Sequence, residues 1–193
     1  MPSRLVGFVF IAIAFGSVSF AQTTVAKIPD PTITGSERLR WLAGENVSPA
    51  ALLSDVGGAA ERTLANSPRE YGPHWEGFGK RVGIIAANYG VETVMEAGLG
   101  SIWGEDPRYN RTEGVGFAGR LGHVVKMTFF ARDRAGNTMP AYARFLAFPG
   151  SNFLANTWMP DSQATMSDAA VRTGMGFLGR MGENAWKEFR PRH

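Results

Sequence analysis

One seven-residue pattern occurs three times in this chain of 193 residues and limits what the chain can fold into. The pattern reads Gly-Phe-x-x-Arg-apolar-Gly, and its copies begin at Gly77, Gly116 and Gly176. The copies are unevenly spaced, which does not fit a solenoid of regular repeats. The pattern contains no nucleophile, base or metal ligand. It therefore predicts a helix surface that the fold uses repeatedly, and it does not indicate a reaction.

The glycines and phenylalanines of the pattern are expected to be structural. A glycine on a helix lets another backbone approach closely, and each Phe is expected on the inner stripe, where a common core would gather the three rings. The residues concerned are Gly77, Phe78, Gly83, Gly116, Phe117, Gly122, Gly176, Phe177 and Gly182.

The arginine of each copy is the feature that could form a binding site. Arg81, Arg120 and Arg180 lie beside the inner stripe, and planar guanidinium groups suit a phosphate or carboxylate. One hypothesis is that the three arginines converge on an anion, such as the phosphate of an anionic lipid. The alternative is that each arginine covers its neighbouring glycine and pairs with a surface acid.

The first 33 residues predict export. Arg4 precedes an uncharged apolar run, and Ser19 and Ala21 are the small residues of a signal-peptide cleavage site. The run is shorter than the roughly 20 residues that span a bilayer, which favours cleavage over anchoring. We expect a signal peptide over residues 1–21, an extended arm over 22–33 and one helical domain over 34–193. The predicted location is the periplasm or outer membrane of a bacterium.

Composition excludes several classes of protein. The chain has no cysteine, so it forms no disulfide and no thiolate zinc site. Its net charge is +3 without a run of five like charges, so nucleic acid is not an expected partner. An anionic lipid or another envelope protein remains a possible partner, and the oligomeric state is left open.

Periodicity predicts an all-α fold, a glycine-rich antiparallel bundle of about four to six helices. Ser36 and Ser48 are expected N-caps, and Asp161 or Ser162 caps the last helix. The segments expected to be helical are 36–41, 49–66, 70–103, 115–132, 138–158 with a break at Pro149-Gly150, and a last helix ending before Pro191. Within residues 124–148 a hairpin with its turn at 133–137 is the competing interpretation.

Helical periodicity also predicts which faces are buried. In segment 70–103, small residues form a groove through Gly79, Gly83 and Gly90, so Gly83→Leu is expected to overpack it. The opposite strip is expected to be wet and holds His74, Arg81, Asn88 and Glu92, with Glu96 at its margin. In the last helix, the expected buried stripe holds Ala170, Gly174, Phe177, Leu178, Met181 and Ala185, and Arg180 is expected to face solvent.

Few residues indicate chemistry. Gly114-x-Gly116-x-x-Gly119 fits a dinucleotide fingerprint but follows no convincing buried strand, so we expect packing glycines and no cofactor. A carboxylate-bridged metal pair would need Glu-x-x-His motifs, which the chain lacks, so no metal is expected. The enzyme alternative is a hydrolase or metal-dependent enzyme using Glu92, Glu96, Asp106 and His123.

Three stretches of the chain together resemble the motifs of a known protein family. They are Gly77-Phe78-Gly79-Lys80-Arg81, Asp106-Pro107-Arg108-Tyr109 and Lys187-Glu188-Phe189. The chain resembles an uncharacterised family of small exported proteins of soil-type bacteria over roughly residues 35–191. The resemblance implies helical structure and export, and it implies no activity. The function expected from the sequence is therefore a non-catalytic envelope protein, structural or binding, that contacts lipid or another envelope component.

Overall fold

The computed structural model describes residues 33–191, which form six α-helices and one short hairpin. The expected signal peptide and most of the expected arm lie outside these residues. The helices are α1 (Gly35–Val47), α2 (Pro49–Leu64), α3 (Trp75–Trp103), α4 (Phe117–Phe129), α5 (Tyr142–Ala155) and α6 (Met166–Phe189). Strands β1 (Phe130–Arg132) and β2 (Thr138–Pro140) pair antiparallel after α4. The prediction of an all-α fold is confirmed.

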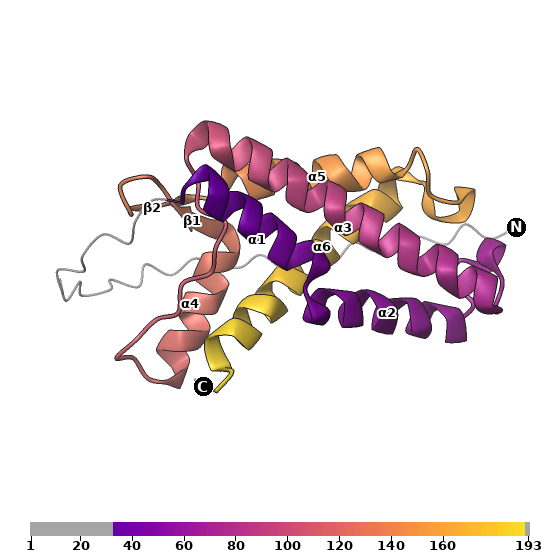
Figure 1. Ribbon diagram of the computed structural model, residues 1–193, viewed down its shortest axis with the longest axis horizontal. Helices are drawn as coiled ribbons and strands as arrows, with labels where there is room; N and C mark the ends of the chain where they lie inside the picture. The colour runs from indigo at the N-terminus through magenta and orange to yellow at the C-terminus, as the bar shows by residue number, and fades with distance from the viewer. Residues whose placement is uncertain (1–32, 192–193) are drawn as a thin grey trace, which may run out of the picture.

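Helix α3 is the longest element and the centre of the fold. Helices α1, α2 and α5 pack on it, while α6 packs on α5 and carries α4 on its other side (Figure 1). Helices α4 and α6 run antiparallel, so the start of α4 lies beside the end of α6 (Figure 1). None of the helices in residues 33–191 is long and apolar enough to cross a membrane.

Helix boundaries follow local capping chemistry. Ser48 accepts the Ala51 N–H, and Pro49 opens α2, as the sequence predicts. Two other predicted caps are wrong, because Thr34 and Thr165 form complete capping boxes that start α1 and α6 instead of Ser36 and Asp161 or Ser162.

Some predicted helix ends are wrong, whereas the long helix is confirmed. Helix α1 continues past residue 41 to Val47, and α3 runs to Trp103 as one helix. Helix α5 continues through Pro149, and it does not begin at Thr138, which lies in β2. A Cβ on Gly150 would lie 2.7 Å from the Met95 side chain, so this glycine lets α5 approach α3. The segment 124–148 combines both interpretations, because α4 ends at Phe129 and the predicted turn at 133–137 joins the strands.

The buried faces of α3 and α6 differ in part from those predicted, although His74 is exposed and Phe177, Met181 and Ala185 are partly buried. Gly79 and Gly83 are exposed, and no atom lies within 4 Å of a Cβ built on either, so the groove and the overpacking by Gly83→Leu are wrong. Arg81, Glu92 and Glu96 of the strip expected to be wet are buried. In α6, Arg180 is buried, while Leu178 is exposed.

The interior is rich in alanine and in charge. Eight of the thirteen buried hydrophobic residues are alanine: Ala59, Ala97, Ala131, Ala141, Ala143, Ala147, Ala155 and Ala169. Buried charged residues include Glu96, Arg144, Arg180 and Glu188. Small side chains let the helices approach each other, and the charged groups between them are held by partners on neighbouring helices.

Candidate functional site

Three helices meet around a buried ion network. Glu96 of α3 accepts from Arg144 Nε of α5 at 2.9 Å and from an Arg180 terminal nitrogen of α6 at 2.6 Å. Arg144 also donates to the carbonyls of Met127 and Thr128 at the end of α4. The network therefore joins α3, α4, α5 and α6 through one carboxylate and two guanidinium groups.

The pKa values of the two arginines shift in opposite directions. Burial lowers the pKa of Arg144, and the Glu96 carboxylate offsets this only in part. Burial would also lower the pKa of Arg180, but the carboxylates of Glu96 and Glu183 outweigh it, so the pKa of Arg180 rises. Both groups are positively charged in the network at neutral pH.

Glu92 lies one turn before Glu96 and is the second buried carboxyl of this region. Burial raises the pKa of Glu92 to about 7, the charge of Glu96 adds to the increase, and Arg180 opposes it. Near neutral pH, Glu92 is therefore divided between its protonated and charged forms.

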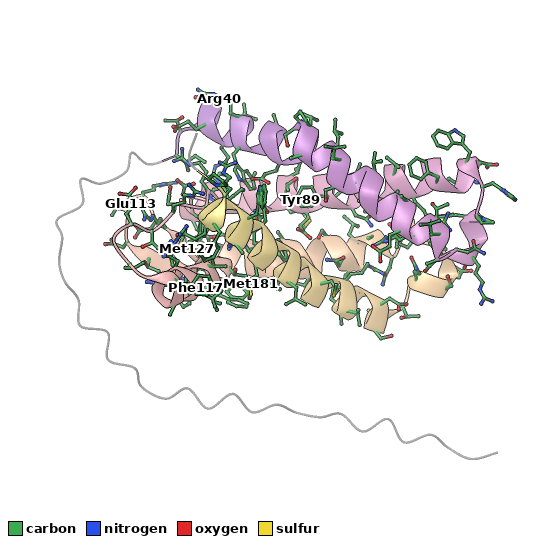
Figure 2. The ribbon with its side chains drawn as sticks, turned by 90° about the horizontal axis from the view of Figure 1, so that it is seen from below. Arg40, Tyr89, Glu113, Phe117, Met127 and Met181 are labelled. Atoms are coloured by element: carbon green, nitrogen blue, oxygen red, sulfur yellow. The ribbon has the colours of Figure 1, made fainter. Side chains whose placement is uncertain are left out.

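Helices α4, α5 and α6 turn apolar side chains to the solvent. In these helices, which the structure describes completely, Lys126 is the only exposed charged residue. We call the following exposed side chains the apolar outer face: Phe117, Leu121 and Val125 of α4, Phe145, Leu146, Phe153 and Leu154 of α5, and Val171, Met175, Leu178 and Trp186 of α6. Figure 2 shows Phe117 at the outer edge of the molecule.

Stacked aromatic rings join the three helices of this face. Phe129 of α4 packs on Phe145 of α5 and on Phe177 of α6, with ring centroids 6.4 and 5.6 Å apart. Phe145 and Phe177 are 5.7 Å apart, which completes the cluster. All three rings are partly accessible, so the cluster continues into the apolar outer face.

The three repeat arginines lie in three different settings. Arg81 is 1 % exposed and donates to the carbonyls of Ser67, Pro68 and Gly72, which fastens the loop before α3. Arg120 pairs with Glu188 at 2.9 Å, and Arg180 belongs to the buried network. The structure therefore does not bring the three arginines together on one anion.

The phenylalanines of the repeat are not gathered either. Phe78 stacks on Trp75, and Phe117 packs on Phe189 while remaining 70 % exposed. Phe177 lies in the aromatic cluster. The glycines differ as well: a Cβ on Gly77 would lie 2.2 Å from the Tyr71 carbonyl, whereas Gly83, Gly116, Gly122 and Gly182 have open space.

Three of the four residues of the enzyme alternative have separate partners, and the fourth, Glu92, is a buried carboxyl beside the ion network. Glu96 belongs to the ion network, Asp106 pairs with Arg108 at 2.7 Å, and His123 Nε2 is 2.8 Å from the Asn110 carbonyl. Within residues 33–191, no group of three His, Asp or Glu side chains is placed to hold a metal ion.

A cavity lined by cations lies at the end of α6. Its volume is about 300 Å³, and its lining residues are Trp41, Arg108, Tyr109, Arg111, Lys187 and Arg190. The loop from Asp106 to Arg111 and the end of α6 supply five of them, and α1 supplies Trp41. Sequence reasoning singled out Arg108 and Tyr109 as a motif but missed the cavity, because its residues are far apart along the chain.

Comparison of the chain with protein-family models, with curated proteins and with solved structures gave no match.

Proposed function

We propose that this protein is a non-catalytic component of the bacterial cell envelope that docks on anionic lipid through its apolar outer face. The observation that carries this proposal is the reversed polarity of α4, α5 and α6. Each of these helices buries charged or polar groups against its neighbours and turns leucine, valine or aromatic side chains outward.

Exposure on this scale supports an interaction surface. Single exposed apolar side chains are ordinary, whereas a contiguous patch of them is typical of a site that binds a partner or a membrane. A lipid surface accepts such side chains without demanding a complementary shape, and each one gains about 1.5–3 kcal/mol when it is fully buried.

The charges beside the face favour anionic lipid as the occupant. Lys126 is the one exposed charge on the three helices, and Arg190 is exposed at the end of α6. Neither forms an ion pair with a carboxylate within the described residues. Basic residues near a membrane attract anionic lipid by about 1 kcal/mol each.

The non-catalytic character is supported by the partners of the candidate catalytic groups. Glu96, Asp106 and His123 are each held by groups of the protein itself. Export is supported by the apolar run and small residues of the first 21 residues.

Sedimentation with vesicles tests the proposal. The full chain without its first 21 residues should bind phosphatidylglycerol vesicles more strongly than phosphatidylcholine vesicles, and added salt should weaken the difference. Leu178→Glu places a charge on the apolar outer face and should reduce binding about tenfold or more. Leu64→Glu is the matched control, because Leu64 is 90 % exposed on α2, outside this face.

Two results would contradict lipid docking. One is equal binding of the wild type and Leu178→Glu to anionic vesicles. The other is a stable dimer in solution that Leu178→Glu dissociates while the wild type ignores vesicles, which would assign the face to a second copy.

A further inference from the structure

The cavity at the end of α6 has the chemistry of an anion site. Four of its six lining residues are cations, Arg108, Arg111, Lys187 and Arg190, and none of its lining residues is acidic. Two of these cations are neutralised by carboxylates that do not line the cavity. Arg108 pairs with Asp106, and Lys187 pairs with Glu45 at 3.0 Å.

The other two cations keep their charge for a ligand. Arg111 uses its Nε and one terminal nitrogen to donate to the carbonyls of Lys187 and Arg190, which fixes its guanidinium at the end of α6. These carbonyl contacts orient Arg111 without neutralising it. The Arg190 side chain has no hydrogen-bond or ion-pair partner within residues 33–191.

An unpaired donor in the cavity wall is an independent sign of a ligand. Trp41 is 9 % exposed, lines the cavity, and has no acceptor for its indole Nε1–H in the described part of the chain. A buried indole N–H normally has a partner, because leaving it without one costs free energy. An oxygen atom of a bound anion would provide that acceptor.

We infer that this cavity binds a phosphoryl group, either in a lipid headgroup or in a free phosphate ester. A phosphate ester carries up to two negative charges, which match the two unneutralised arginines, and its several oxygens can accept from planar guanidinium groups and from the indole N–H. A cavity of about 300 Å³ has room for a small headgroup such as glycerol phosphate.

The identification of the ligand as a lipid headgroup rests on the proposed function. The binding of a phosphoryl group in the cavity does not. Glycerol 3-phosphate is a soluble probe that carries the phosphoryl group without acyl chains, and glycerol is the uncharged control. Titration calorimetry of the full chain at low salt should show binding of glycerol 3-phosphate and no binding of glycerol.

Two substitutions test whether the binding is in the cavity. Arg190→Gln removes an exposed cation, and Trp41→Phe removes the unpaired N–H but keeps a ring; each should weaken glycerol 3-phosphate about tenfold. Arg40→Gln is the matched control, because it removes an exposed cation next to Trp41 that does not line the cavity (Figure 2). Circular dichroism melts check that each variant is folded.

The outcomes are distinct. The absence of binding by the wild type, or equal binding by all variants, overturns the inference. If glycerol 3-phosphate binds and also displaces the protein from phosphatidylglycerol vesicles, the ligand is a lipid headgroup. If it binds without displacing the protein, the ligand is a free phosphate ester. A Leu178→Glu protein that binds glycerol 3-phosphate but not vesicles shows that the two sites are separate.

Discussion

Replacing Glu92 with glutamine should stabilise the protein above neutral pH. Glutamine has nearly the shape of a protonated glutamate and carries no charge, so Glu92→Gln imitates the form of Glu92 that burial favours. The groups that face this position are Glu96 on the same helix, Arg144 of α5, and Arg180 and Glu183 of α6. None of these changes in the variant.

The magnitude follows from the pKa of Glu92, which burial raises from 4.5 to about 7. Below about pH 4.5 the carboxyl is protonated in both the folded and the unfolded chain, so it does not change the free energy of unfolding with pH. Between pH 4.5 and 7 the unfolded chain releases the proton while the folded chain keeps it, so the free energy of unfolding decreases as pH rises. The loss is complete above about pH 7 and amounts to about 3 kcal/mol.

Urea unfolding followed by circular dichroism from pH 4.5 to 8 measures this effect as the difference between Glu92→Gln and the wild type. The difference should be small at pH 4.5 and should grow to about 3 kcal/mol in favour of the variant at pH 8. Glu76→Gln is the control, because Glu76 is an exposed carboxylate at the other end of α3. A difference that stays constant with pH, or a wild type that is more stable at pH 8, would refute the reasoning.

Two further substitutions test the packing. Arg144→Met should destabilise the protein by about 3–5 kcal/mol in urea unfolding, because it leaves Glu96 without one of its two buried partners, while Lys80→Met at an exposed pair should cost less than about 1 kcal/mol. Gly77→Ala should lower the melting temperature, because its Cβ would overlap the Tyr71 carbonyl, whereas Gly83→Ala should raise it slightly. Equal effects within either pair would contradict the described burial.

The sequence predicted the helices better than it predicted their buried faces. Capping by Ser48, the long helix to Trp103 and the turn at 133–137 depend on neighbours within a few residues, and all three are confirmed. The burial of Arg180 depends on Glu96, which is 84 residues away in the chain. The periodicity of residues within one helix cannot predict an ion pair with a residue on another helix.

The burial of Arg180 could not be predicted from the pattern of α6 alone. Periodicity assigns apolar stripes to the interior, so Leu178 was expected inside and Arg180 outside. In α6 the charged stripe is buried by partners on other helices, and the apolar stripe is left outside. The cation-lined cavity could not be predicted for a similar reason, because Trp41 and Arg190 come together only in the folded chain.

Quenching of tryptophan fluorescence by brominated lipid tests the docking face most directly. Trp186 is 68 % exposed on α6 within the apolar outer face, and Trp75 is 81 % exposed at the start of α3, away from it. Vesicles of phosphatidylglycerol with brominated acyl chains should quench the wild type, and Trp186→Phe should remove most of the quenching while Trp75→Phe leaves it unchanged. Quenching that survives in Trp186→Phe and disappears in Trp75→Phe would contradict docking through α4, α5 and α6.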